Sequence, residues 1–101
     1  MTTPAFQQEL GRYAEVIVQV GLNLQPGQRL LIRPDVQTAP LVRAVARAAY
    51  AAGAPFVDVI WSDEQLTLVR AQSAPAGSFG EIAAWLPEVS AAHIRAGGAL
   101  L

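Results

Sequence analysis

The chain contains no cysteine and only one histidine, His93. Without cysteine it has no disulfide framework, no thiolate metal site and no cysteine nucleophile. Lysine is absent too, because all seven basic residues are arginines, scattered from Arg12 to Arg95 without a run. Together with eight acidic residues they give a net charge of −1. This balance argues against a nucleic-acid partner, which would require a clustered basic patch.

Long apolar runs are missing as well. No stretch reaches the roughly 18 unbroken apolar residues that a membrane helix needs. The N-terminus, Met1-Thr2-Thr3-Pro4, lacks the basic and apolar regions of a signal peptide. Hydrophobic residues nevertheless make up 52% of the 101 residues and charged residues only 15%, which excludes a disordered chain. We therefore expect one soluble, cytoplasmic domain with its own core and no membrane partner.

Two helices are predicted in the N-terminal half. The first runs from about Thr3 to Val20, because Pro4 suits its first turn and Gly21 can end it. The second runs from about Thr38 to Ala52 and is rich in alanine, the best helix former. The expected buried face of the first helix consists of Phe6, Leu10, Tyr13, Ala14, Ile17 and Val20. That of the second consists of Leu41, Val45, Ala48, Ala49 and Ala52, with Arg43 and Arg47 in water.

Two strands flank the second helix. A Pro26-Gly27 turn precedes the apolar run Arg29–Arg33, which predicts a strand buried on both faces. The β-branched and aromatic residues of Phe56–Trp61 predict a second strand. A strand, a helix and a strand joined by short connections form a right-handed unit, which implies a parallel sheet.

Two capping motifs organise the C-terminal half. In Ser62–Gln65 a hydroxyl precedes a glutamine by three positions, which predicts a helix from Asp63 to about Gln72. The segment Ser78–Glu81 has the same pattern and predicts a further helix. Pro87 should kink or restart that helix, which ends near Ala96.

The residues Ala99-Leu100-Leu101 follow two glycines and predict the first residues of a third strand. The expected fold class is therefore α/β, a helix-flanked parallel sheet within a single unit over residues 1–101. Its expected order is helix, strand, helix, strand, helices and the start of a third strand. A sheet that stops there leaves an apolar edge, and such edges pair with other chains, so we expect self-association through Ala99–Leu101.

Charged side chains follow both predicted strands, at the edge where ligands bind in an open parallel sheet. Arg33 and Asp35 follow the first strand, and Asp63 and Glu64 follow the second. One arginine and three carboxylates offer partners for a hard cation or an anionic substrate. For Asp63 and Glu64, helix capping is a simpler interpretation, since the macrodipole favours acids in a first turn.

Asp58 is a further candidate for this carboxyl-edge site, because it lies in the middle of a strand that should be buried. A buried carboxylate needs a partner. Arg29, Arg33 or a helix arginine can provide one. A satisfied polar group at a half-exposed edge is the alternative to a functional role.

Several common sites are excluded. The segment Pro34–Thr38 has no glycine, so no dinucleotide-binding turn follows the first strand. No Gly-Lys-Ser/Thr motif is present, and no serine lies in a nucleophile elbow. His93 is predicted in the last turn of the final helix, without another histidine or a cysteine to complete a metal site. The residues by themselves identify no catalytic or metal-binding centre.

Several segments together resemble a known family. The most specific are Gly21-Leu22-Asn23-Leu24-Gln25-Pro26-Gly27-Gln28 and Trp61-Ser62-Asp63-Glu64, and the others are Tyr13–Val18, Ala39–Arg43, Ala49–Ala54 and Val57–Ile60. The chain is similar over nearly its whole length to the N-terminal portion of the thermophilic-type metallo-aminopeptidases, the family of aminopeptidases T and S. None of these segments is an active-site motif.

The resemblance carries expectations about function. Family members are several times longer and use two divalent metal ions (zinc, cobalt or manganese) to remove N-terminal amino acids from peptides. Their metal ligands lie beyond the region that this chain resembles, so no catalytic or metal-binding residue is carried over. The resemblance therefore implies an incomplete N-terminal domain of an aminopeptidase, which takes a peptide substrate only in the full-length enzyme. We expect no peptidase activity and no bound cofactor for these 101 residues alone.

Two alternatives stay open. A free-standing α/β binding or interaction module related to that domain would close its own sheet and remain well folded. A small enzyme that uses Asp58 or Asp63 would require a carboxylate with a strongly perturbed environment in a pocket.

Overall fold

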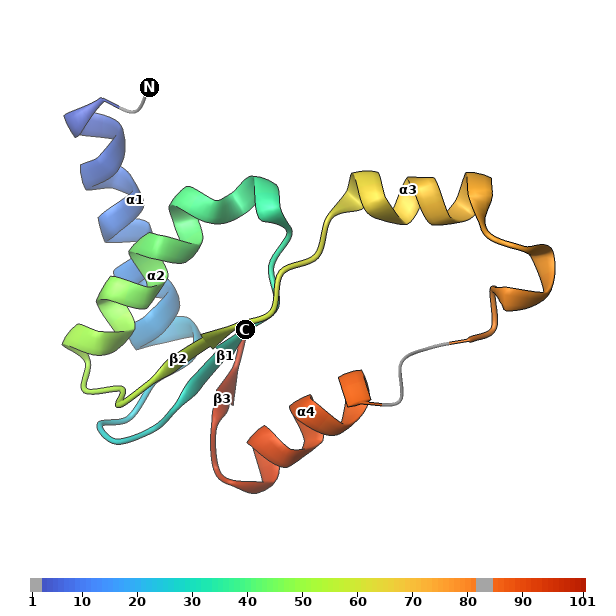
Figure 1. The fold of residues 1–101 in the computed structure, drawn as a ribbon. Helices are drawn as coiled ribbons and strands as arrows, with labels where there is room; N and C mark the ends of the chain where they lie inside the picture. Colours follow the sequence, from blue (N-terminus) through green and yellow to red (C-terminus); the bar gives the residue numbers. More distant parts are fainter. Residues whose placement is uncertain (1–2, 82–84) are drawn as a thin grey trace.

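Three short parallel strands form the centre of the fold (Figure 1). The computed structural model describes residues 3–81 and 85–101. The strands are β1 (Leu30–Ile32), β2 (Val57–Val59) and β3 (Ala99–Leu100), in the order β2-β1-β3. Leu30 is in register with Val57 on one side and with Ala99 on the other. The predicted parallel α/β sheet is thus confirmed, and so is its third strand.

The central strand β1 is buried on both faces, as predicted. Successive side chains of a strand point to opposite faces of the sheet. Leu30 and Ile32 belong to the main hydrophobic core. Leu31 lies on the opposite face, where it lines a hollow together with Val89 and His93 of the last helix, α4 (Trp85–Arg95). The sheet therefore lies between α4 and a layer formed by the first two helices (Figure 1).

The first helix, α1 (Pro4–Val16), continues as a π-helix, η1 (Ile17–Gly21). Its start is as predicted, because the Thr3 hydroxyl accepts a hydrogen bond from the backbone N–H of Phe6 at 3.1 Å. The wider turn of η1 was not predicted. In it the backbone N–H of Leu22 donates to the carbonyl oxygen of Ile17, five residues earlier, at 2.8 Å.

The side chains that reach the core differ from the predicted buried face of this helix. Ala14 and Val18 are completely buried, whereas Tyr13 and Val20 are 60% and 75% exposed. The predicted buried face is therefore wrong at Tyr13 and Val20, and also at Phe6, which is half exposed. A π-turn contains more residues than an α-turn, so Val20 is rotated away from the position that a regular 3.6-residue spacing predicts. Phe6 and Tyr13 precede this turn, so it does not explain their exposure.

The second helix, α2 (Ala39–Ala51), follows a short 3₁₀ turn, η2 (Val36–Thr38), and packs on α1 and the sheet. Arg43 and Arg47 are exposed, as predicted. The buried residues of α2 are Val42, Ala44, Val45 and Ala49, while Leu41, Ala48 and Ala52 are partly buried against the same core. The small alanine side chains allow the close approach of the two helices.

The turns that precede β1 and β2 are in contact with each other. In the Pro26-Gly27 turn, the N–H of Gln28 donates to the carbonyl of Gln25 at 3.0 Å, and Gly27 has the positive φ that glycine tolerates. Gly53, which ends α2, also has a positive φ of 101°. A Cβ at Gly53 would lie 3.1 Å from the Cα of Pro26, so the two turns are in close contact.

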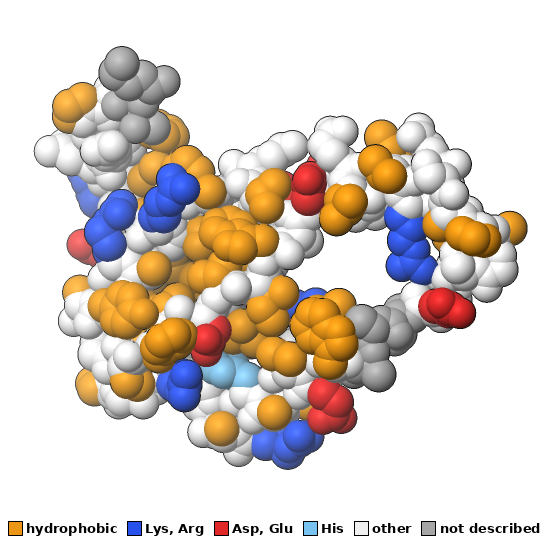
Figure 2. All heavy atoms as spheres, in the orientation of Figure 1, with side chains coloured by type: hydrophobic (Ala, Val, Ile, Leu, Met, Phe, Trp, Pro, Cys, Tyr) orange, Lys and Arg blue, Asp and Glu red, His pale blue; other side chains and the backbone are white. Residues whose placement is uncertain are grey.

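The segment between β2 and α4 leaves the rest of the molecule as an arm. It contains α3 (Glu64–Ser73) and a 3₁₀ turn, η3 (Ala76–Ser78). We refer to residues 64–81 as the arm, and to residues 3–63 and 85–101 as the body. In Figure 2 an open space separates the arm from the body even with all side chains drawn. The radius of gyration is accordingly 16.2 Å, whereas a compact chain of this length has about 13 Å.

The capping motifs differ in detail from the prediction. The side chain that caps α3 is that of Asp63, whose carboxylate accepts a hydrogen bond from the N–H of Gln65 at 3.0 Å. The hydroxyl of Ser62 instead donates to the carbonyl of Pro34 at 3.2 Å. The predicted helix start at Ser78 is also wrong, because Ser78 is the last residue of η3 and residues 79–81 are not helical. Its hydroxyl donates to the carbonyl of Pro75 at 2.7 Å.

The last helix agrees with the prediction at its C-terminal end, because α4 ends at Arg95, just before the two glycines. Pro87 lies in the first turn within the bounds of α4. Residues 82–84, where the predicted helix from Ser78 would pass, lie outside the described residues. Across the part of the chain that the structure describes, no helix combines the length and apolar character needed to cross a membrane.

Candidate functional site

The segments that follow β1 and β2 stay paired beyond the strands. Asp35 and Ser62 form an isolated parallel bridge. The N–H of Val36 donates to the carbonyl of Ser62 at 2.8 Å, and the N–H of Ser62 donates to the carbonyl of Pro34 at 2.9 Å. This pairing brings the polar residues after the two strands to one edge, as the sequence predicts for a parallel sheet.

Asp35 uses both carboxylate oxygens for backbone N–H groups. Its Oδ1 accepts from the N–H of Gln37 at 2.9 Å, which caps η2. Its Oδ2 accepts from the N–H of Glu64 at 3.0 Å, at the first residue of α3. Since Asp63 caps the same helix, two carboxylates bind the N-terminus of α3, where unpaired N–H groups and the macrodipole favour negative charge.

The carboxyl-edge candidates therefore come together only in part. Asp35, Asp63 and Glu64 meet at the start of α3, and the two aspartates have capping roles there. Arg33 leaves this edge in another direction, because its Nη1 donates to the hydroxyl of Ser90 in α4 at 3.3 Å. Its backbone N–H donates to the carbonyl of Leu101 at 3.1 Å. The arrangement joins the sheet edge to α3 and α4.

Asp58 lies apart from the other candidates. Asp58 pairs in register with Leu31. This pair lies four positions before the Asp35–Ser62 bridge, a separation of roughly 13 Å along the strands. The expectation that Asp58 is buried is wrong, because its side chain is 42% exposed. The cause is the strand order, which places β2 at an edge of the sheet among the described residues. The alternative, a paired polar group at a half-exposed edge, is confirmed.

The partner of Asp58 is Arg29, one of the arginines that the sequence suggests. The distance from Arg29 Nη2 to Asp58 Oδ2 is 3.7 Å, and the arginine side chain is 56% exposed. Its guanidinium also lies 5.2 Å from the centre of the Phe56 ring. A loose ion pair in water contributes little to stability.

A hollow of about 380 Å³ lies at the carboxyl edge of the sheet. It contains one cationic side chain, that of Arg33, and is otherwise mainly apolar. Its lining residues are Arg33, Ile60, Trp61, Ser62, Leu86, Leu100 and Leu101. Such a surface suits an apolar group next to a hydrogen-bond acceptor more than it suits a metal ion, which requires several carboxylate or imidazole ligands.

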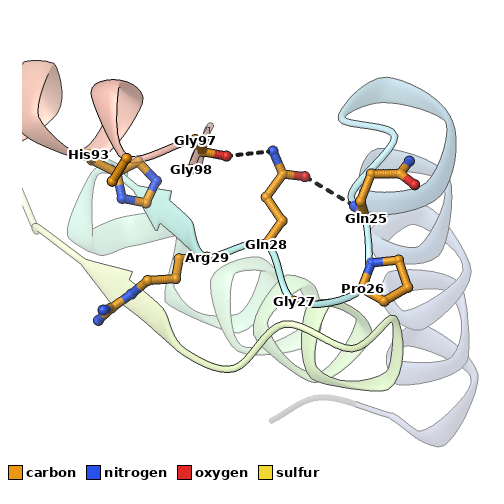
Figure 3. Close-up of a pocket in the computed structure, with 9 residues that line it drawn as sticks. Gln25, Pro26, Gly27, Gln28, Arg29, His93, Gly97 and Gly98 are labelled. Atoms are coloured by element: carbon orange, nitrogen blue, oxygen red, sulfur yellow. Dashed lines mark hydrogen bonds between the residues drawn. The ribbon is translucent and has the colours of Figure 1, made fainter.

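A second hollow, of about 470 Å³, lies at the opposite edge, between the Pro26-Gly27 turn and the end of α4 (Figure 3). The side chain of Gln28 spans its floor. Gln28 Nε2 donates to the carbonyl of Gly97 at 3.1 Å, and its Oε1 accepts from the N–H of Gln25 at 3.0 Å. The bond to Gly97 joins residues that are 69 positions apart, so no local sequence signal could have revealed this hollow.

His93 lines the same hollow, and its ring is held by the backbone. Its Nε2 lies 2.6 Å from the carbonyl oxygen of Ala99, which makes Nε2 the donor. Gly98 makes this position possible, because a Cβ on Gly98 would collide with the imidazole ring. The bond connects the last turn of α4 to β3.

These residues do not provide the ligands of a dinuclear metal centre. Among residues 3–81 and 85–101, no three histidine, cysteine, aspartate or glutamate side chains are placed to hold a metal ion. Asp35 and Asp63 already bind backbone N–H groups, and His93 is bonded to the backbone. No step of a metal-assisted reaction can be assigned to these side chains.

Comparison with known proteins identifies the family of this chain. The model of the thermophilic metalloprotease family, M29, matches residues 6–101. The chain belongs to this family.

Curated relatives support the assignment to the M29 family. Aminopeptidase 2 of Geobacillus stearothermophilus is 45% identical over 76 residues, which are 75% of this chain and 18% of that protein. Aminopeptidase T of Thermus thermophilus is 36% identical over 97 residues, 96% of this chain and 24% of that protein. Aminopeptidase AmpS of Bacillus subtilis is 33% identical over 81 residues, 80% of this chain and 20% of that protein.

A solved structure also matches the fold of this M29 chain. Wild-type AmpT from Thermus thermophilus superposes with a TM-score of 0.86 at 34% identity, over 92% of this chain and 23% of that one. This M29 chain thus spans about a fifth to a quarter of the length of these relatives. The resemblance inferred from the residues, to the N-terminal part of this family of metallo-aminopeptidases, is confirmed.

Proposed function

We propose that this chain is the non-catalytic N-terminal α/β part of a metal-dependent aminopeptidase that removes N-terminal amino acids from peptides. The observation that carries the proposal is the M29 match over residues 6–101, together with the small share, 18–24%, of the matched relatives that it covers. The family's description as metalloproteases implies a metal centre in the whole enzyme. The described residues of this chain offer no ligand set for it.

In this proposal the chain has a structural role. It contributes a parallel sheet with a buried core, a capped junction at Asp35 and Asp63, and an arm. Peptide binding and hydrolysis then require the part of the enzyme that holds the metal ions. A bound divalent ion supplies the activated water and the polarised carbonyl in metallopeptidases.

The experiment that tests the proposal is a chimera. This chain replaces the aligned first 24% of aminopeptidase T from Thermus thermophilus, and release of leucine from a leucyl peptide is measured with zinc, cobalt or manganese. We expect metal-dependent activity from the chimera and none from the 101-residue chain under the same conditions. Activity of the isolated chain would refute the proposal. A folded chimera without activity would favour a free-standing binding module instead.

We also propose that the isolated chain self-associates through the outer edge of β3. Leu100 and Leu101 are 39% and 44% exposed. Exposed apolar edge strands pair with other chains because their backbone groups lack partners. Light scattering should show dimers or larger species, and Leu100→Lys should shift them toward monomer, since an edge charge opposes pairing. A monomer at high concentration would contradict this proposal.

A further inference from the structure

The helix of the arm has apolar side chains but no buried residue. Leu66, Leu68 and Val69 are 67%, 50% and 53% exposed, and Phe79 after η3 is half exposed as well. At 100° per residue, Leu66, Val69 and Leu68 are distributed over roughly 160° of the helix circumference. An amphipathic helix with an apolar stripe of this width normally packs that face against another element.

The helix is also too short to be stable by itself. Isolated helices of fewer than about 12 residues are marginal in water, because nucleation is unfavourable and tertiary packing supplies most of their stability. α3 has 10 residues and touches the body mainly through its capped first turn. The described residues of the body do not supply such packing.

The arm nevertheless has a defined internal structure. Arg70 in α3 donates from Nη2 to the carbonyls of Ser78 at 2.8 Å and Glu81 at 3.0 Å. The hydroxyl of Ser78 donates to the carbonyl of Pro75, which closes η3. These bonds fix the returning segment against α3, so the arm presents a preformed apolar surface. Figure 2 shows hydrophobic side chains at the surface of the arm, away from the body.

More than half of the arm lies within the region that superposes on a much longer relative. The alignment with wild-type AmpT from Thermus thermophilus covers 92% of the 101 residues and leaves out only about eight of them. The arm has 18 residues, from 64 to 81, so more than half of it must lie within the superposed region. The remaining 77% of the AmpT chain lies outside the match, which covers 23% of it.

We propose that the arm, through Leu66, Leu68, Val69 and Phe79, is a docking surface for the part of an M29 aminopeptidase that follows the region matched by this chain. This inference rests on the proposed function. A second copy of the chain is the less suitable occupant. α3 is about 15 Å long and 10 Å wide, so its face is far smaller than the ~800 Å² per partner of a stable interface.

Amide hydrogen exchange of residues 64–81 tests this docking directly. We compare the isolated chain with the chimera in which this chain replaces the first 24% of Thermus thermophilus aminopeptidase T. In the isolated chain the arm should exchange almost freely, and in the chimera at least about tenfold more slowly, because docking buries its hydrogen bonds. The double variant Leu66→Gln/Val69→Gln of the chimera should lose this protection and unfold at lower temperature, although glutamine and leucine have similar helix propensities.

Two variants serve as controls in the chimera. Val20→Gln changes an exposed apolar residue of the body, and Gln72→Ala changes a polar residue of the same helix. Both should retain the protection of the arm. Loss of protection in Val20→Gln as large as in the double variant would contradict a specific role of the arm.

The outcomes separate docking from the proposed function. An active chimera whose arm exchanges as fast as in the isolated chain overturns the docking inference and leaves the proposed function intact. If the arm of the isolated chain becomes more protected as the concentration of the chain rises, the docking inference is overturned in favour of a second copy. If the chimera fails to fold, the same exchange measurement on whole aminopeptidase T, at the segment aligned with residues 64–81, decides the question, and fast exchange there overturns docking.

Discussion

The body and the arm of this chain contain similar apolar side chains, but among the described residues only the body buries any of them completely. Leu30, Val18 and Val45 in the body are fully buried, whereas Leu66, Leu68 and Val69 in the arm are at least half exposed. Both regions contain capped helices with good helix-forming residues. The comparison shows that local capping and propensity can specify a helix, while burial depends on which elements surround it.

The largest expected difference comes from removing the same side chain in each region. Leu30→Ala should destabilise the chain by about 2–5 kcal/mol, because it leaves a cavity in a closely packed core. Leu66→Ala should change stability by less than about 0.5 kcal/mol, because the side chain is exposed. Urea unfolding of the isolated chain measures both values. Equal losses would mean that the arm is already packed in the isolated chain.

A smaller difference is expected between two glycines. Gly98→Ala should cost about 1–3 kcal/mol, since the new methyl group collides with the His93 ring. Gly77→Ala in the arm meets nothing within 4 Å and should be close to neutral. Thermal unfolding of the two variants tests this contrast. The double variant His93→Ala/Gly98→Ala should recover part of the loss, and no recovery would place the strain elsewhere.

The junction between body and arm should respond more weakly. Asp63→Ala removes the cap of α3 and should cost about 0.5–2 kcal/mol of local helix stability. Asp35→Ala should affect exchange in both η2 and α3, because this carboxylate binds an N–H group in each. Hydrogen exchange of residues 36–38 and 64–67 distinguishes the two variants. Identical patterns would show that Asp35 does not couple the two segments.

The smallest effect is expected at the surface of the body. The pair between Arg29 and Asp58 spans 3.7 Å between half-exposed side chains. A double-mutant cycle with Arg29→Gln and Asp58→Asn should give a coupling energy of about 0–1 kcal/mol, and less at high salt. A coupling that is larger, or that does not fall with salt, would indicate that β2 is covered in solution.

Much of the body is predictable from local patterns. The run Leu30–Ile32 between arginines, the Pro26-Gly27 turn and the glycines after α4 each specify an element or its end. The carboxyl-edge arrangement of Asp35 and Asp63 also follows, because parallel strands end at the same edge. The predicted elements and their ends depend only on residues that are close in sequence, and the edge arrangement follows from the parallel sheet that these elements imply.

The errors have tertiary causes. Val20 was assigned to the core because a regular helical spacing was assumed, and η1 interrupts that spacing. Asp58 was expected to be buried because its strand is apolar, whereas the strand order places β2 at an edge of the sheet among the described residues. The hollow around Gln28 depends on a contact with Gly97 across almost the whole chain.

The sequence alone determined the types of element, most of their boundaries, the parallel sheet and the family resemblance. These properties depend on spacing, capping and turn residues that act over a few positions. Only the tertiary structure decided the strand order, the exposure of Asp58, the contact of His93 with Ala99 and the separation of the arm from the body. The physical reason is that each of these depends on which distant segments meet, and many arrangements are compatible with the same local pattern.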